Sequence, residues 1–235
     1  TVDMCGFNIA GPKSREMLQR LSNQDLSNNN WPFMHSGQLS IAGVECLALR
    51  ISFSGDLGWE IYCDAEYQEI IYKTLIKASL IENGGPVGSR ALMSLRIEKG
   101  YGSWSREYSP EVWPHESGLE KLCKLDKDFL NKRALVENLK NEPRERLVLI
   151  KLDEQDCKKS NADATGGEPI FYSGKGIGRI TSGAYGYNVG MSLALGYVKD
   201  VSAGDTVDVM ILGEPHKGKI LKAPPFDPEG KILRG

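Results

Sequence analysis

Apolar and polar residues alternate along much of the first part of the chain, and elsewhere apolar residues recur every three or four positions. Alternation predicts strands, because successive side chains of a strand point to opposite faces. The recurrence every three or four positions predicts helices. The predicted strands cover residues 3–10, 38–41, 45–51 and 58–62. The predicted helices begin after Gly11-Pro12 and cover 64–78 and 89–99. This part of the chain therefore predicts an antiparallel sheet with helices.

After a charged stretch around Pro143 the pattern changes to short strands separated by glycine-rich turns. Six strands of this kind predict a small barrel. They cover residues 147–152, 169–172, 177–181, 192–198, 206–212 and 217–222. The expected fold class is α+β, with one domain over 1–140 and a barrel domain over 146–235. Between the predicted helix 89–99 and the barrel, residues 101–114 are rich in aromatic residues but show no periodic pattern. Such a segment is typical either of a binding loop or of a loop that fills part of the core.

Composition narrows the classes of function. Lys and Arg total 29 against 31 Asp and Glu, so there is no basic excess to bind a nucleic acid. No apolar run approaches the roughly 18 residues of a membrane span, so we expect no membrane partner. The cysteines are scattered and the histidines do not cluster, which predicts no metal site. Unpaired, reduced cysteines are typical of a protein in the cytoplasm or the mitochondrial matrix. The cysteines are Cys5, Cys46, Cys63, Cys123 and Cys157.

The segment 52–62 carries the chemistry that the pattern singles out. Gly55 and Gly58 permit a tight reversal with unusual backbone angles. From Gly58 onward, alternation puts Glu60 and Tyr62 on one strand face and apolar neighbours on the other. A carboxylate in such surroundings is costly to bury unless hydrogen-bond donors reach it, which makes Glu60 a candidate for ligand recognition. The alternative is an edge-strand Glu that points into water.

Two segments carry a resemblance to a known family. Ser52-Phe53-Ser54-Gly55-Asp56-Leu57-Gly58-Trp59-Glu60 resembles the S/G-Y-T-G-E-x-G-x-E segment of the aminomethyltransferases, the T-protein of glycine cleavage and its relatives. Ser94-Leu95-Arg96-Ile97-Glu98-Lys99-Gly100-Tyr101, with Trp104 and Glu107, resembles the folate-binding C-terminal part of dimethylglycine and sarcosine dehydrogenases. The resemblance implies a partial T-protein-type folate-binding domain followed by the family's C-terminal β-barrel domain.

The function implied by this resemblance is tetrahydrofolate-dependent one-carbon transfer, in which an aminomethyl or methylene group passes to the folate. The implied partners are folate, a small methylated amine and an N-terminal polypeptide preceding Thr1. FAD is implied only for a separate upstream domain, if at all. Two departures, Phe53 for a family Tyr and Leu92 for a family Arg, favour the alternative of a non-catalytic folate-binding or scaffolding module.

The resemblance also implies which residues bind the cofactor. In the family the last Glu of the segment binds the pterin ring, and the resemblance therefore implies this role for Glu60. The remaining candidates are either neighbours of that segment or aromatic residues in loops, and Tyr185 and Tyr187 stay open between ligand contact and structural turn. The complete set is Glu60, Phe53, Tyr62, Tyr101, Tyr185 and Tyr187. No catalytic residue is assigned, because the family places its catalytic carboxylate upstream, and we expect this chain alone to be inactive. Arg96 and Glu98 are expected to form ion pairs.

Overall fold

The computed structural model describes residues 3–235, and the chain packs as two compact units. The first unit comprises residues up to Met93 together with Asp227–Gly235, and the second comprises Ser94–Phe226. No helix of the described residues is long and apolar enough to cross a membrane. Each unit has its own apolar core, and the expected α+β class with a terminal barrel is confirmed.

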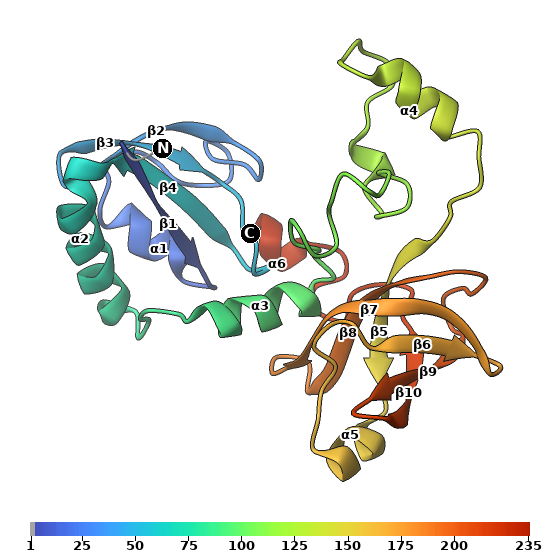
Figure 1. Cartoon of the computed structure of the whole chain (residues 1–235). Helices are drawn as coiled ribbons and strands as arrows, with labels where there is room; N and C mark the ends of the chain where they lie inside the picture. The colour runs from blue at the N-terminus through green and yellow to red at the C-terminus, as the bar shows by residue number, and fades with distance from the viewer. Residues whose placement is uncertain (1–2) are drawn as a thin grey trace. The chain divides into compact units, whose positions relative to one another are not determined.

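The first unit is built on a four-stranded antiparallel sheet with the order β1-β4-β3-β2 (Figure 1). The strands are β1 (Met4–Ala10), β2 (Ser36–Ile41), β3 (Val44–Leu49) and β4 (Gly58–Asp64). All four lie where alternation predicted them. The turn between β2 and β3 is the predicted Ala42-Gly43, and both residues have positive φ there.

One face of this sheet is covered by helices and the other is not. The helices are α1 (Ser14–Gln19) and α2 (Gln68–Ile81), the latter preceded by the 3-10 turn η1 (Ala65–Tyr67). Their apolar side chains, such as Leu18 and Ile71, share one core with Trp59 and Ile61 of β4. Within this unit, the described helices thus leave the Glu60 side of the sheet uncovered.

A buried arginine joins the last residues of the chain to this unit. Arg50 is fully buried and donates to the carbonyl oxygens of Gly58 and Leu233, both at 3.2 Å. Its guanidinium lies over the Trp59 ring, 4.6 Å from the centroid. Burial, with a smaller contribution from the nearby Arg15, lowers the pKa of Arg50 to about 10, so it is still charged at neutral pH. The helix α6 (Lys231–Arg234), which contains Leu233, is therefore fastened to the start of β4.

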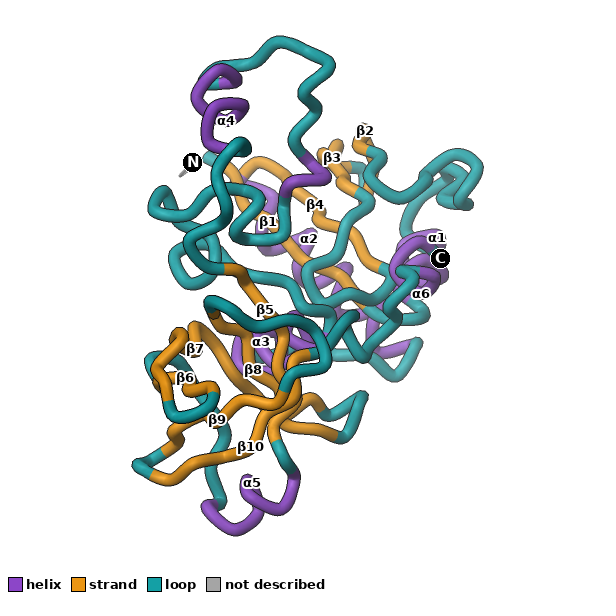
Figure 2. Tube along the Cα trace, turned by 90° about the vertical axis from the view of Figure 1, so that its right-hand side faces the viewer, coloured by secondary structure: helices purple, strands orange, loops and turns teal. Residues whose placement is uncertain are grey.

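The second unit contains the predicted six-stranded barrel, closed in the order β10-β5-β8-β7-β6-β9 (Figure 2). The strands are β5 (Arg146–Leu152), β6 (Pro169–Tyr172), β7 (Lys175–Gly186), β8 (Met191–Val198), β9 (Thr206–Ile211) and β10 (Glu214–Ile220). β7 continues well past the predicted end at Thr181, with a register shift between Ile180 and Ser182. The polar helix α5 (Glu154–Ser160) was not predicted, and it begins where the Asp153 carboxylate accepts from the backbone N–H groups of Gln155 and Asp156.

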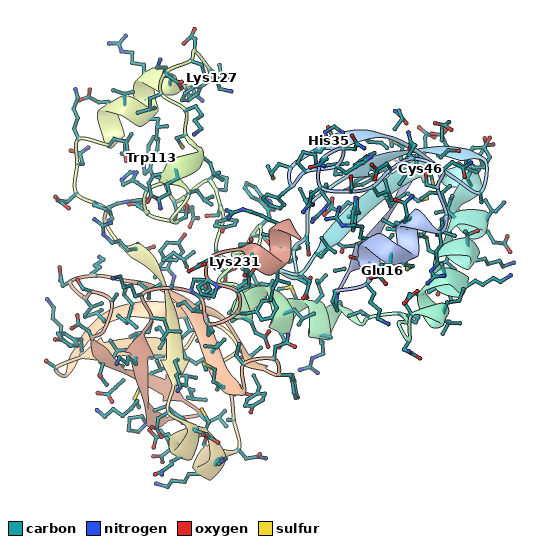
Figure 3. The ribbon with its side chains drawn as sticks, turned by 180° about the vertical axis from the view of Figure 1, so that it is seen from behind. Glu16, His35, Cys46, Trp113, Lys127 and Lys231 are labelled. Carbon is teal, nitrogen blue, oxygen red and sulfur yellow. The ribbon has the colours of Figure 1, made fainter. Side chains whose placement is uncertain are left out.

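Before the barrel, the second unit holds the end of α3 (Ser89–Glu98) and a long irregular segment. Gly100 has φ 70° and ends α3, as predicted. The 3-10 turn η2 (Glu120–Leu122) and the helix α4 (Lys132–Asn138) lie on the segment 113–144. This segment, called the arm below, stands away from the barrel strands (Figures 1 and 2). Figure 3 labels Trp113 and Lys127 on this arm.

The Glu116 carboxylate connects the two ends of the arm, near Trp113 and near Arg144. Glu116 is 2% exposed and forms an ion pair with Arg144 at 2.8 Å. It also accepts from the backbone N–H groups of Trp113 and Arg144, at 2.8 and 3.1 Å. The hydrogen bond from the Arg144 side chain is the main cause that lowers the pKa of Glu116 to about 2.

We predict that the end of α3 is part of the barrel's folding unit. Ile97 packs in one cluster with Leu149, Leu193 and Leu195 of the barrel. A fragment Arg146–Phe226 should therefore melt below a fragment Ser94–Phe226, since losing one buried isoleucine costs about 2 kcal/mol. For domains of these sizes that corresponds to roughly 4–16 °C in calorimetry. Ile97→Ala in the longer fragment is the matched control and should also lower its Tm. Equal melting of all three proteins would contradict the assignment.

We also predict an acid dependence that belongs to Glu116. Its native pKa lies below the unfolded value, so its stabilising contribution is complete above about pH 4.3 and is lost as pH falls toward 2. Glu116→Gln should lower Tm at pH 7, and the Tm gap to the unmodified protein should close as pH falls from about 4.3 to about 2. Glu137→Gln, which removes a carboxylate paired with Lys140 on the surface, should follow the unmodified protein throughout. A Tm gap for Glu116→Gln that is the same at every pH would show that the charge is not responsible.

Candidate functional site

The Glu60 carboxylate lies half-buried on the uncovered face of the first unit's sheet, next to Tyr62 on the same strand. The Tyr62 hydroxyl donates a hydrogen bond of 2.6 Å to Glu60 Oε2. This bond, together with burial and the negative charge of Glu60, raises the pKa of Tyr62, so the phenol remains a donor at neutral pH. Trp59 and Ile61 point into the core on the other face, as alternation predicted. The strand thus presents an oriented carboxylate outward.

A glycine on the neighbouring strand makes room for this pair. Gly6 of β1 lies directly opposite Tyr62 of β4. A Cβ atom at position 6 would lie 2.8 Å from Tyr62 Cε1, which is too close for the ring to remain where it is. The sequence offers one signal for this contact, an isolated glycine within an alternating strand, which often marks close approach of another group.

Other neighbours of Glu60 come from both adjacent strands. Asn8 of β1 and Leu49 of β3 lie opposite Glu60 in the two registers. Among the described residues, only the Tyr62 hydroxyl donates a hydrogen bond to the Glu60 carboxylate. An ionised carboxylate has about four acceptor positions, so it can take further donors from a ligand.

The loop before β4 corrects one detail of the sequence interpretation. Gly55 has φ 87°, the unusual backbone angle that was expected. Gly58 has no such angle, and it is required for another reason: a Cβ there would lie 2.7 Å from the carbonyl oxygen of Ile9 and 2.9 Å from Ser52 Cβ. Close packing of β4 on β1 therefore demands Gly58. Phe53 in this loop is half-buried.

The remaining candidates belong to the second unit. Tyr185 and Tyr187 form an edge-on aromatic pair with ring centroids 5.1 Å apart, and Tyr187 is 81% exposed. Tyr185 lies at the end of β7 and Tyr187 in the turn that follows, and α3 holds this end of the strand: Ser94 Oγ donates to the Tyr185 carbonyl oxygen at 2.5 Å. One turn further, Glu98 accepts from the backbone N and the side-chain Nδ2 of Asn188, at 2.9 and 2.8 Å. Glu98 therefore accepts hydrogen bonds from Asn188 in place of the ion pair that was expected for it.

The ion pair expected for Arg96 is confirmed, and it is completely buried. Arg96 Nη1 lies 2.9 Å from Glu107 Oε2, and both side chains are 0% exposed. Burial alone would raise the pKa of Glu107, but hydrogen bonds from Ser182 and Thr181, with Arg96 and the Ser103 N–H, lower it instead. Glu107 therefore stays ionised and joins the 101–117 segment to β7.

Tyr101 follows directly after α3. Its side chain is half-buried, and its carbonyl oxygen accepts from Arg96 Nη1 at 2.9 Å. The backbone N–H of Tyr101 in turn donates to the Arg96 carbonyl oxygen at 2.8 Å, which closes the helix end. The candidate residues therefore form two groups. Glu60, Tyr62 and Phe53 lie in the first unit, and Tyr101, Tyr185 and Tyr187 in the second.

Other kinds of site have no support in the described residues. No group of three or more His, Cys, Asp or Glu side chains among them is arranged to hold a metal ion. Two surface hollows lie on the arm around Asn131 and along α2 around Thr74, and neither is lined by a candidate residue. The Glu60–Tyr62 pair is the most specific arrangement of polar groups among the candidates.

The chain is similar to dehydrogenases and to aminomethyltransferases. It is 36% identical over 222 residues to mitochondrial dimethylglycine dehydrogenase of Mus musculus, covering 93% of this chain and 25% of the relative. Mitochondrial sarcosine dehydrogenase of Mus musculus is 31% identical over 99% of this chain and 26% of its own length. The chain thus spans about a quarter of these relatives. An aminomethyltransferase of Desulfitobacterium hafniense is 31% identical, with 93% of this chain and 59% of the relative covered.

The fold is similar to that of a solved aminomethyltransferase. The crystal structure of glycine cleavage system aminomethyltransferase T from Bartonella henselae matches 96% of this chain and 60% of its own, with a TM-score of 0.82 and 21% identity. Residues 1–127 match the family described as GCVT N-terminal domain, and residues 145–227 match the glycine cleavage T-protein C-terminal barrel domain. The chain therefore belongs to the glycine cleavage T-protein family.

Proposed function

We propose that this chain binds tetrahydrofolate and that Glu60 recognises the edge of its pterin ring. The observation that carries the proposal is the half-buried Glu60 carboxylate, oriented by Tyr62 on an uncovered sheet face of a T-protein family member. A pterin edge presents two adjacent N–H donors, and one ionised carboxylate accepts both in a paired, charge-assisted geometry.

The described residues fit this ligand edge. Tyr62 uses Glu60 Oε2, and a carboxylate oxygen can accept a second hydrogen bond, so both pterin donors find an acceptor. Leu47 and Leu49 of β3 lie opposite Tyr62 and Glu60, and they offer apolar surface to a flat ring. Leu47 is exposed, so its side chain is accessible to such a ring. The polar and apolar groups of the site therefore match the two characters of a pterin, a polar edge and an apolar face.

The proposed reaction is the transfer of a one-carbon unit from a small methylated amine to the folate, within a protein similar to dimethylglycine or sarcosine dehydrogenase. Bound tetrahydrofolate supplies the nitrogen nucleophile that accepts the carbon. The residues of this chain bind and orient it, and such positioning can contribute a large share of the rate. We assign the pterin-binding part to the domain 1–140 and the family barrel to the domain 146–235.

We extend the proposal to the aromatic candidates. Phe53 lies in the loop that precedes β4, where its ring can border the pterin without a hydrogen bond. Tyr185 and Tyr187 form an exposed aromatic pair on a turn that α3 holds by two hydrogen-bonded side chains, and such rings stack on flat ligands. Tyr101 is the remaining aromatic candidate, and it lies directly after the closed end of α3.

A non-catalytic folate-binding or scaffolding module is the second candidate function. It is favoured by two side chains, Phe53 and Leu92, that carry no polar group where the aminomethyltransferase pattern has a Tyr and an Arg. Both are half-buried, Phe53 in the loop before β4 and Leu92 on α3. Under this alternative the chain binds folate without forming methylenetetrahydrofolate from formaldehyde or an amine donor. Turnover by the 235-residue chain would exclude this alternative, and it would also contradict the expectation that the chain alone is inactive.

Glu60→Gln should weaken tetrahydrofolate binding at least about tenfold. The amide replaces one acceptor with a donor that faces the pterin N–H groups, and an unsatisfied polar group of this kind costs about 1–3 kcal/mol. Isothermal titration calorimetry measures the change. Glu45→Gln is the matched control, since Glu45 is exposed on the adjacent strand β3 and should leave the affinity unchanged. Equal affinities of the Glu60 variant and the unmodified protein would refute the assignment.

Tyr62→Phe and Gly6→Val should weaken the same binding, each up to about tenfold. The first variant removes a hydrogen bond worth about 0.5–1.5 kcal/mol, and the second pushes the Tyr62 ring away from Glu60. Because both act through one bond, the double variant should lose no more than either single variant in the same titration. Losses that add in full would show that the two residues act independently.

A further inference from the structure

Three cysteines lie side by side in the core-facing half of the first unit's sheet. Cys5 of β1 is paired directly with Cys63 of β4, and their Sγ atoms are 3.3 Å apart. Cys46 of β3 belongs to the same apolar core, and Figure 3 labels it on the sheet. All three are free thiols. Their side of β4 is opposite to the one that carries Glu60.

The backbone places Cys5 and Cys63 at a spacing that suits a disulfide. Ala65 N–H donates to the Asp3 carbonyl oxygen, and Gly11 N–H donates to that of Leu57, which marks the hydrogen-bonded positions along these two strands. Cys5 and Cys63 lie two residues further from Asp3 and Ala65, so they occupy another such position. Cα atoms in these pairs are about 5.5 Å apart, within the roughly 4.4–6.8 Å that a disulfide spans.

We propose that Cys5 and Cys63 are an oxidation site, at which peroxide converts the two thiols to a reversible cross-strand disulfide. The Cys5 thiolate attacks one peroxide oxygen, the O–O bond breaks, and the released hydroxide leaves as water after taking a proton. The resulting sulfenic acid is attacked by the Cys63 sulfur, which loses its proton and expels the second oxygen as water. Two thiols and one hydrogen peroxide thus give one disulfide and two waters, with two electrons passing from sulfur to oxygen.

The surroundings assign the two thiols different roles. Cys5 is half-exposed on β1, an edge strand of the sheet, where a small oxidant can reach it. Cys63 is 3% exposed, and burial raises its pKa to about 12, so it remains a thiol at neutral pH. Cys63 is therefore the resolving sulfur. Cys5, Cys46 and Asp64, which face it, raise its pKa further, and its attack should become faster as pH rises.

The third thiol tests the specificity of the pair. Cys46 is fully buried, and burial also raises its pKa. Its Sγ donates to the Val44 carbonyl oxygen at 3.6 Å. An oxidant from solvent reaches Cys5 first, so the bond forms between Cys5 and Cys63 rather than between Cys63 and Cys46.

The experiment maps thiols in the purified chain after treatment with hydrogen peroxide, followed by alkylation and mass spectrometry of tryptic peptides. Cleavage after Lys13, Arg50 and Lys73 places Cys5, Cys46 and Cys63 in three different peptides, so each pairing has its own mass. We expect a linked Cys5–Cys63 peptide that dithiothreitol separates, and a bond that forms at least several-fold faster at pH 9 than at pH 7. Cys46→Ser should leave this peptide in place.

Two results would overturn the proposal. One is a linked Cys46–Cys63 peptide in place of the Cys5–Cys63 peptide. The other is a Cys5 that stays alkylatable, or is oxidised to the sulfinic acid, while no link forms. Because these readouts come from the unmodified chain, they do not depend on whether a Cys5 or Cys63 variant folds. Cys123, a half-exposed thiol of the second unit, reports within the same digest that the oxidant was active.

Discussion

The structure of the first unit depends on the two-sidedness of β4. Trp59, Ile61 and Cys63 complete the core on one face, and Glu60 and Tyr62 stand on the other. A slip of one residue would bury the carboxylate and expose the indole, and both changes are costly. The register is held where β4 begins: β1 approaches Gly58 too closely for any side chain, and Arg50 holds the Gly58 carbonyl from inside the core.

A second constraint organises the other unit. The Arg96–Glu107 pair is completely buried, and removing one partner from such a pair leaves an uncompensated charge that costs several kcal/mol. Ser182 and Thr181 of β7 and the Ser103 N–H satisfy the remaining acceptor positions of Glu107. α3 is therefore attached to the barrel by a charged centre as well as by Ile97. The same helix holds the end of β7 with Tyr185 and the following turn with Tyr187 through Ser94 and Glu98.

How far the sequence predicts this structure follows from the range of each interaction. Alternation is local, so it was sufficient to place Glu60 and Tyr62 on one face and to locate all four sheet strands. The contact of Gly6 with Tyr62 and that of Glu107 with Ser182 join residues far apart in the chain. An isolated glycine in a strand can mark close approach of some group, but no local pattern names the partner residue. The helix α5 was missed because its residues are almost all polar and its start depends on one capping Asp153. Gly58 was recognised as necessary, but close packing rather than backbone angle is the reason.

The return of residues 227–235 to the first unit has a consequence for the order in which the chain folds. A ribosome makes the whole of 94–226 before it makes Leu233, whose carbonyl oxygen binds Arg50 and whose side chain is buried. The second unit can therefore be complete while Arg50 still lacks one of its acceptors. During synthesis the earlier unit in the sequence is thus completed after the later one, because its packing requires residues 227–235.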